Sequence, residues 1–168
     1  MKTLTLKNKS LFVWPIISTA TLLIFFFTFT QSTYGAGSSS KPLSASEKRE
    51  RANVYFSEAE NFQAQELYKE AAEQYKKAIN KDKNYAEAHS NLGYCYRKQG
   101  LFKKAVKSYK KAIKLDPKLA EAHEYIGEAY AEMGKFDLAG KHLQILRDLG
   151  SPEAGELDEF ITRLKKNA

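Results

Sequence analysis

The sequence repeats itself at a fixed interval over most of its length, and this regular repeat constrains the fold more than any other feature. Residues 86–119 align with residues 120–153 without a gap. Identical positions recur between the two segments; among them, Ala86, Ala88, His89, Gly93, Tyr96, Gly100, Phe102 and Ala105 match Ala120, Ala122, His123, Gly127, Tyr130, Gly134, Phe136 and Ala139. Residues 52–85 continue the same columns with Ala59, Phe62, Tyr68, Ala71, Tyr75 and Ala78. Units of this length stack on one another to bury a continuous core, so we expect a short repeat array.

Each repeat is predicted to be a pair of helices. In residues 86–119, apolar residues recur at helical spacing on both sides of Gly100, which is expected to end the first helix in the left-handed conformation. Gly134 has the same place in the next repeat. Gly93 and Gly127 lie inside first helices, where glycine costs about 1 kcal/mol relative to alanine. We therefore expect close packing against these two positions.

Further signals predict where helices begin. Ser44 and Glu47 have the spacing of a capping box, ahead of one long helix that starts before the first repeat and shields it. Asp116-Pro117 and Ser151-Pro152 each predict an N-cap followed by proline at the first helical position. The second pair predicts a seventh helix at residues 152–165, which caps the open end of the stack.

The repeat resembles the tetratricopeptide repeat family. The matching residues of the second unit are Leu92, Gly93, Tyr96, Ala105, Tyr109, Ala112 and Pro117, and the third unit keeps Ile126, Gly127, Tyr130 and Ala139. His89 and His123 stand where the family has tryptophan, and the first unit has Glu58-Ala59 in place of Leu-Gly. The resemblance implies an all-α, right-handed superhelix of three helix-turn-helix units, at residues 52–85, 86–119 and 120–153, within a domain of residues 44–168.

Residues 1–36 are predicted to be a secretory signal peptide. An uncharged stretch at residues 11–30 follows three lysines: Lys2, Lys7 and Lys9. Cleavage after Ala36 or Gly35 would leave residues 37–43 as a flexible tether. The alternative is a retained anchor, because a helix of twenty uncharged residues spans a hydrocarbon core of about 30 Å. Both interpretations place the repeats outside the cytoplasm, as a periplasmic or secreted protein or one tethered to the inner membrane by residues 11–30.

Composition and motifs argue against an enzyme. The single cysteine, Cys95, cannot form an internal disulfide or a thiolate cluster, and its neighbours favour a small buried side chain. His89 and His123 occupy equivalent repeat positions, too far apart to share a metal, and His142 has no evident partner. The sequence has no phosphate-binding loop and no nucleophile motif. We expect a non-enzymatic protein without a cofactor or a metal.

The resemblance implies that the first helices of the units line a concave groove that receives a segment of another protein. The predicted lining is Asn53, Phe56, Glu60, Gln63, Glu87, Ser90, Asn91, Tyr94, Arg97, Lys98, Glu121, Glu124, Tyr125, Glu128 and Glu132. Tyr94 and Tyr125 are the expected anchors. We expect Arg97 and Lys98 on one wall and the carboxylates on the other. Such a groove suits a partner segment of mixed or positive charge that carries an apolar side chain.

One subfamily of these repeats grips the terminal carboxylate of heat-shock chaperones. It uses lysine and asparagine in its first unit, asparagine in its second, and lysine and arginine in its third. At the corresponding places this chain has Phe56 and Glu60, then Asn91, then Glu121 and Tyr125. Only Asn91 matches, so binding of a chaperone tail is not expected.

Lysines are concentrated on the predicted second helices and suggest an alternative function. A convex basic ridge is predicted from Lys103, Lys104, Lys107, Lys110, Lys111 and Lys114. It would attach a structural protein to an anionic membrane surface or an envelope polymer. The net charge of +7 falls to +4 if the signal peptide is removed. Nucleic acid is not expected, because export separates the chain from it and no aromatic residues interleave the lysines for base stacking.

Overall fold

The computed structural model describes residues 42–167, which form seven helices and no strand. The helices are α1 (Ala45–Ala64), α2 (Tyr68–Lys81), α3 (Ala86–Lys98), α4 (Phe102–Leu115), α5 (Ala120–Glu132), α6 (Phe136–Asp148) and α7 (Glu153–Lys166). None of them is both long enough and apolar enough to cross a membrane. The predicted signal peptide or anchor, and most of the predicted tether, lie outside the described residues.

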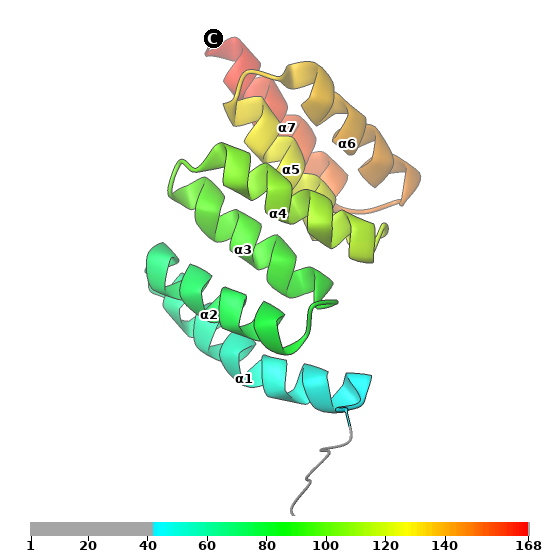
Figure 1. Cartoon of the computed structure of the whole chain (residues 1–168). Helices are drawn as coiled ribbons and strands as arrows, with labels where there is room; N and C mark the ends of the chain where they lie inside the picture. Colours follow the sequence, from blue (N-terminus) through cyan, green and yellow to red (C-terminus); the bar gives the residue numbers. More distant parts are fainter. Residues whose placement is uncertain (1–41, 168) are drawn as a thin grey trace, which may run out of the picture. The chain divides into compact units, whose positions relative to one another are not determined.

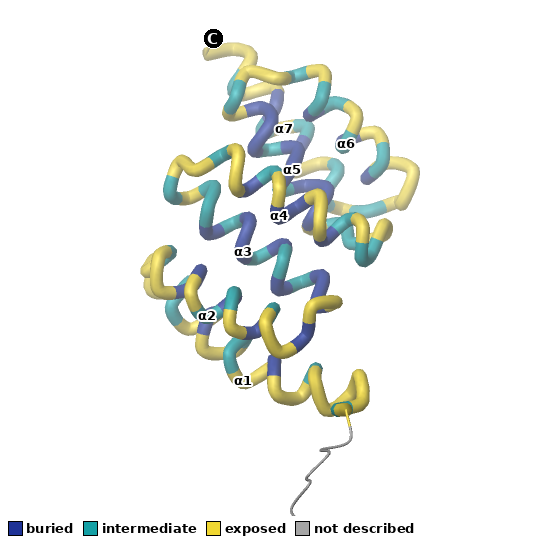
Figure 2. Tube along the Cα trace, in the orientation of Figure 1, coloured by how far each residue is buried: buried dark blue, intermediate teal, exposed yellow. Residues whose placement is uncertain are grey.

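Successive helices pack side by side in one stack, as Figure 1 shows. The pairs α1 and α2, α3 and α4, and α5 and α6 are the three predicted hairpins, and α7 closes the series, so the all-α repeat fold is confirmed. Helix α3 also contacts α5, and α5 contacts α7. These first helices therefore form a continuous surface, and Figure 2 shows that buried residues are concentrated along α3 and α5 in the middle of the stack.

The two glycines inside first helices do lie under closely packed side chains. A Cβ atom added to Gly93 would lie 2.6 Å from Cε1 of Tyr109, which is on α4. One added to Gly127 would lie 2.5 Å from Cδ2 of Leu157, which is on α7. Both separations are far below van der Waals contact, so the missing methyl group is what allows these side chains to pack against the helix backbone.

The turn inside each hairpin uses the same backbone conformation at the same repeat position. Gly100 and Gly134 have φ angles of 71° and 70°, as their sequence positions predicted. The equivalent residue of the first hairpin is Glu66, which has a φ angle of 59°. A non-glycine residue in this region costs roughly 1 to 2 kcal/mol. The packing of the hairpin thus imposes its turn geometry even where the sequence lacks glycine.

The predicted starts of helices are confirmed at one end of the chain and corrected elsewhere. Ser44 and Glu47 form the predicted capping box at the start of α1. Asp116 is not an N-cap: it is the C-cap residue of α4, and its side chain accepts the backbone N–H of Lys118 at 2.9 Å, because aspartate readily bonds two residues ahead in a turn. Helix α5 therefore begins only at Ala120. Helix α7 begins at Glu153, and the Ser151 hydroxyl contacts the Glu153 side chain instead of capping a backbone N–H.

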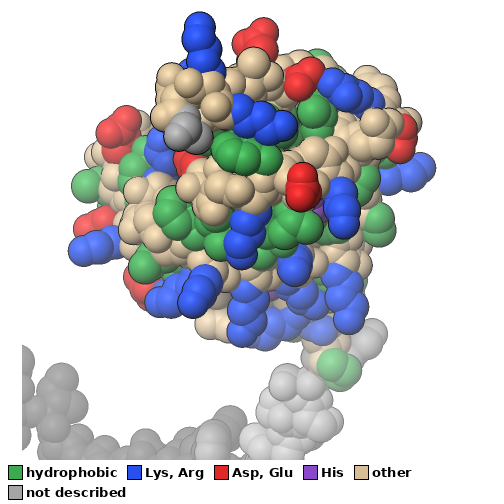
Figure 3. Space-filling view, turned by 90° about the horizontal axis from the view of Figure 1, so that it is seen from above, with side chains coloured by type: hydrophobic (Ala, Val, Ile, Leu, Met, Phe, Trp, Pro, Cys, Tyr) green, Lys and Arg blue, Asp and Glu red, His purple; other side chains and the backbone are tan. Residues whose placement is uncertain are grey.

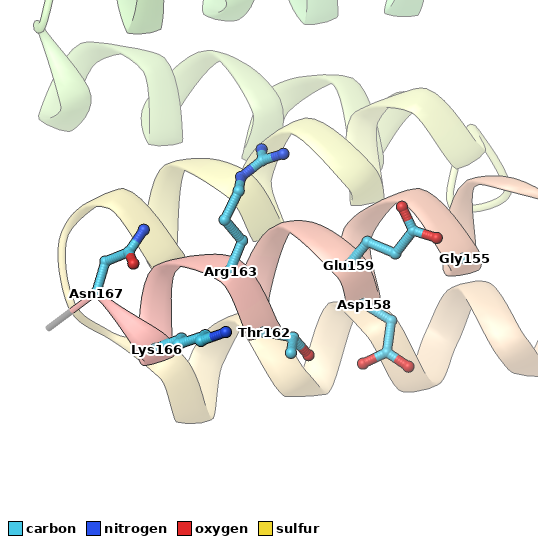
Figure 4. Close-up of a pocket in the computed structure, with 7 residues that line it drawn as sticks. All are labelled: Gly155, Asp158, Glu159, Thr162, Arg163, Lys166 and Asn167. Carbon is cyan, nitrogen blue, oxygen red and sulfur yellow. The ribbon is translucent and has the colours of Figure 1, made fainter.

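The last helix closes the stack with an apolar inner side and a polar outer side. Leu157 and Ile161 are buried against the core that α5 and α6 share. The outer side carries a hollow of about 690 Å³, lined by Gly155, Asp158, Glu159, Thr162, Arg163, Lys166 and Asn167. Figure 4 shows the Arg163 and Asp158 side chains leaving α7 in opposite directions. Because every lining residue comes from this helix or the residue after it, the hollow is the solvated end of the stack, as expected of a cap.

Gly93→Ala is expected to lower the free energy of unfolding by up to about 2 kcal/mol. The rigid Tyr109 ring cannot move away cheaply, and the overpacking cost of roughly 1 to 3 kcal/mol exceeds the gain of about 1 kcal/mol in helix propensity. Urea denaturation of the purified variant and its parent measures the difference.

Gly140→Ala is the matched control for this measurement. Gly140 lies inside α6, and a Cβ atom there would meet no heavy atom within 4 Å. This variant should gain up to about 1 kcal/mol, since only the propensity changes. A Gly93→Ala protein that is more stable than its parent would contradict the packing described above.

Candidate functional site

Four neighbouring tyrosines lie across the middle of the stack, two of them on first helices and two on second helices. The rings of Tyr94 on α3 and Tyr125 on α5 lie 5.3 Å apart between centroids. Tyr68 lies on one side of this pair, 6.1 Å from Tyr94, and Tyr109 lies 6.1 Å from Tyr125. Tyr94 and Tyr125 are both partly exposed. The two predicted anchors are therefore neighbours that present one aromatic surface.

Charged side chains surround this aromatic pair. We call the whole surface the first-helix face: Tyr94, Arg97 and Lys98 from α3, Glu121, Glu124, Tyr125, Glu128 and Glu132 from α5, and Glu153 and Glu156 from α7. Six of its ten residues are glutamates and two are basic, so an excess of negative charge faces any partner that binds here.

Ion pairs join the two predicted walls of opposite charge. Arg97 Nη2 lies 2.7 Å from Glu128 Oε2, and Arg97 Nη1 donates to Glu132 Oε1 at 2.9 Å. The arginine crosses from α3 to α5 and is held inside the carboxylate cluster, because adjacent first helices lie close enough for the side chain to bridge them. Lys98 is exposed, with its Nζ 5.8 Å from the ring centroid of Tyr68 and 5.7 Å from that of Tyr94.

Glu124 differs from the other carboxylates of this face. The residue is 8% exposed, and its carboxylate makes no hydrogen bond or ion pair within the described part of the chain. Burial raises the pKa of its carboxyl to about 7, and the charges of Glu128, Glu156, Glu153 and Glu121 contribute to the same rise. Glu124 is thus a buried acid held among like charges.

The sequence analysis missed the contribution of α7 to this face. Glu153 and Glu156 both act on Glu124, although they were assigned only to the capping helix. The order of the helices could have predicted this contribution. The helix after the third hairpin packs where the first helix of a fourth repeat would lie, so its residues continue the same surface.

The structure does not bring every predicted lining residue to the surface. Ser90 is fully buried. Phe56 stacks on Tyr85 with ring centroids 4.7 Å apart and also contacts Tyr75, so it belongs to the core near α1. Asn91 donates to the Tyr75 hydroxyl at 3.2 Å. Glu60 is exposed on α1, at the other end of the stack from α7.

All six lysines of the predicted basic ridge are exposed on α4: Lys103, Lys104, Lys107, Lys110, Lys111 and Lys114. Helix α4 contains no acidic residue, and none of the six forms an ion pair within residues 42–167. A hollow of about 370 Å³ is lined by Lys104, Lys107 and Lys111 with His89, Leu92, Tyr96 and Ser108. Figure 3, which views the stack from above, shows lysine and arginine side chains gathered along one part of the surface.

Cys95 is buried, as predicted. It is 0% exposed, and burial raises the pKa of its thiol to about 12. The thiolate that nucleophilic chemistry requires is therefore not formed at neutral pH. No group of three or more potential metal ligands occurs among the described residues.

The prediction that His142 has no partner is wrong. His142 Nδ1 lies 3.1 Å from His123 Nδ1, and His123 Nε2 lies 3.0 Å from the carbonyl oxygen of Pro117. A carbonyl only accepts, so His123 Nε2 carries a proton, and one proton is shared between the two facing Nδ1 atoms. Burial lowers the pKa of His142 to about 4, and His123 contributes to the same fall. His142 is therefore neutral near pH 7, and its contact with His123 joins α5 to α6.

Comparison with known proteins supports the repeat assignment. A family model described as TPR repeat matches residues 62–100 and 93–134. The first TPR of Spaghetti (RPAP3), bound to the HSP90 peptide SRMEEVD, is similar with a TM-score of 0.63 and 22% identity, covering 70% of this chain and 95% of that one. The TPR2B domain of yeast Sti1, in a complex with pHsp70, has a TM-score of 0.64 and 20% identity over 73% and 99% of the two chains.

A bacterial structure has the same fold. The translocator chaperone SycD of type III secretion in Yersinia enterocolitica has a TM-score of 0.62 and 20% identity, covering 70% of this chain and 91% of that one. No curated protein matched the sequence. At these identities the likeness to the solved structures is one of fold.

Glu124→Gln is expected to make stability depend less on pH. The pKa of Glu124 rises from an ordinary value of 4.5 to about 7 in the folded chain, so the folded state binds the proton more tightly than the unfolded state. Stability is therefore lost as the pH rises from about 4.5 to 7. The glutamine variant avoids this loss and should be more stable than its parent at pH 8 by on the order of 1 to 2 kcal/mol.

Urea unfolding at pH 5 and pH 8 checks this expectation. The advantage of the variant should shrink toward the lower pH, where the parent carboxyl is protonated as well. An advantage that is the same at both pH values would mean that Glu124 does not titrate as the geometry requires.

Proposed function

Because the chain belongs to the tetratricopeptide repeat family, we propose that it is a non-enzymatic scaffold that holds a segment of a partner protein against the first-helix face. The partly exposed pair of Tyr94 and Tyr125 within a ring of charges is the observation that supports this function most directly. Aromatic side chains beside charged groups are the usual anchors of protein interfaces. The Spaghetti and Sti1 structures, in which TPR domains are bound to chaperone peptides or proteins, support a peptide as the partner.

The charge of the face disfavours a chaperone tail as the occupant. The face carries six glutamates against Arg97 and Lys98, and Arg97 is already paired with Glu128 and Glu132. An acidic tail would meet like charge, which disfavours association. The absence of chaperone-tail binding stays a prediction, and micromolar binding of the SRMEEVD peptide would contradict it.

The proposed scaffold acts outside the cytoplasm. This proposal is supported by the three lysines ahead of the uncharged stretch at residues 11–30, which together have the layout of an export signal. Cell fractionation and the mass of the purified protein separate the alternatives: a cleaved chain begins near residue 36, whereas a retained anchor keeps the full mass and stays with the membrane.

The double variant Tyr94→Ala, Tyr125→Ala is expected to weaken partner binding by 10-fold to 100-fold. Loss of one central aromatic anchor typically costs about 2 kcal/mol, and the two rings form one surface. The affinity is measured by fluorescence anisotropy, with peptides first selected from a displayed random library for binding to the parent protein.

The double variant Lys107→Glu, Lys111→Glu is the control for that measurement, because both lysines lie on α4 outside the first-helix face. Its affinity for the selected peptides should change less than threefold. The scaffold function on this face would be disproved if the lysine variant lost binding while the tyrosine variant kept it.

The second candidate function is attachment to an anionic surface through the basic ridge. The specific observation in its favour is that six exposed lysines on one helix have no acidic partner among the described residues. Each lysine near an anionic membrane contributes about 1 kcal/mol of attraction.

Sedimentation with phosphatidylserine-containing vesicles tests the ridge. The parent should be retained at low salt and released as the salt concentration rises, and Lys107→Glu, Lys111→Glu should reduce retention at least tenfold. Retention that is insensitive to this charge reversal, or equal on neutral vesicles, would exclude the ridge as the attachment surface.

A further inference from the structure

Equivalent buried tyrosines lie where one hairpin packs against the next, which we call a junction, and only the tyrosine hydroxyl of the first junction has two hydrogen-bond partners. Tyr75 on α2 and Tyr109 on α4 occupy the same repeat position, and both are 0% exposed. The Tyr75 hydroxyl donates to Gln63 Oε1 at 3.0 Å and accepts from Asn91 Nδ2 at 3.2 Å. The hydroxyl of this first junction therefore has both a donor and an acceptor as partners.

At the second junction the equivalent residues are charged or aromatic. Arg97 is the counterpart of Gln63 in the next repeat, and Tyr125 is the counterpart of Asn91. The Tyr109 hydroxyl is buried with the Arg97 guanidinium beside it, but the two do not form a hydrogen bond of good geometry in the described structure; burial raises the pKa of Tyr109, and Arg97 opposes that rise. A buried hydroxyl without a partner costs about 1 to 3 kcal/mol. The second junction therefore differs from the first in how its tyrosine hydroxyl is satisfied.

The same junction borders the unpaired acid of the first-helix face. Glu124 is more than nine-tenths buried, and the charged groups that act on it are four other glutamates: Glu121, Glu128, Glu153 and Glu156. We call Glu124 with these four residues the acidic end. Of its members, only Glu128 has a basic partner within the described residues, Arg97. Burying a carboxylate without a counter-charge is costly, so the acidic end is complementary to a cation.

We propose that the acidic end holds the ammonium or guanidinium group of a lysine or arginine side chain from the partner segment, with Glu124 as its closest acceptor. This inference rests on the proposed function and names the class of ligand. Glu124 acts on Tyr125, whose ring lies 5.3 Å from that of Tyr94, and this aromatic pair would cover the aliphatic stem of the bound side chain. Aromatic faces also attract cations directly.

Competition from the protein's own cations does not prevent this binding. Arg97 is held by Glu128 and Glu132, and Lys98 lies against the Tyr68 and Tyr94 rings without an ion pair in the described structure. Glu121, Glu124, Glu153 and Glu156 remain available to an external cation. Because the face supplies both an aromatic surface and the carboxylates, a peptide side chain fits it better than a free polyamine, which would use only the charges.

An array of dodecapeptides made from Leu, Tyr, Ser and Gly tests the proposal, with each peptide synthesised in four versions that carry Lys, Arg, Gln or Glu at the centre. The array is probed with labelled full-length protein. Among the sequences that bind, the Lys and Arg versions should bind at least tenfold more tightly than the Gln version, and the Glu version should be weakest. The preference should be smaller at pH 5 than at pH 8, because protonation neutralises Glu124.

Two matched variants assign the preference to its residue. Glu124→Gln should reduce the preference for Lys over Gln below threefold, while Glu58→Gln, the same change at an exposed position of α1, should retain it. Glu124→Gln is not expected to unfold the chain, since it removes an unfavourable buried charge. A preference that survives in Glu124→Gln, or that is absent from the parent, would overturn the proposal.

The outcomes separate this inference from the proposed function. If all four versions bind the parent equally and Tyr94→Ala, Tyr125→Ala abolishes binding, the scaffold function stands and the cation site is wrong. If no version binds, both fail. If spermidine displaces the Lys peptides at an equal concentration, the occupant is a free polyamine and the peptide assignment is wrong.

Discussion

The close approach of Tyr109 to Gly93 is the contact on which the arrangement of the surface depends. With no side chain on Gly93, the tyrosine ring lies directly against α3 and extends past it toward α5, where Tyr125 meets it. In the first hairpin, Tyr75 and Ala59 occupy the equivalent repeat positions, and both are fully buried. Because small residues recur opposite these tyrosines, the first helices lie next to one another and their side chains form one face.

This regular packing makes the differences between repeats informative. The backbone places residues 63 and 97, and residues 91 and 125, at equivalent positions of two junctions. Gln63 and Asn91 complete a neutral network around Tyr75, whereas Arg97 turns to the carboxylates of α5. The fold is the same at both junctions, so its requirements alone do not explain the change. At the second junction, residues that would complete a neutral hydrogen-bond network are replaced by charged residues that face the surface. A loss of stability of this kind is expected at a binding site.

The sequence was sufficient to predict the helices because the signals for them are local and repeated. Gly93, Gly100 and Ala105 recur at the equivalent positions of the next repeat. Each recurring residue indicates one requirement of helix packing or of turn conformation. Pairings between helices were not predictable in this way. The contact of Arg97 with Glu128 and that of His123 with His142 depend on how adjacent helices are rotated, which the period does not specify. The prediction that Asp116 is an N-cap was wrong for a different reason: its side chain accepts a hydrogen bond within a local turn and not at the start of a helix.

The two candidate surfaces differ in how much their unpaired charges cost, and this difference favours the first-helix face. The six lysines of α4 are solvated, and exposed charges without partners lose little, because even a formed surface ion pair contributes only about 0 to 1 kcal/mol. A solvated basic helix therefore needs no ligand to explain it. Glu124 is buried among like charges, and no helix propensity or core packing compensates it. A fold keeps such a destabilising buried carboxylate when the carboxylate binds a group outside the chain. A cationic partner would remove the destabilisation.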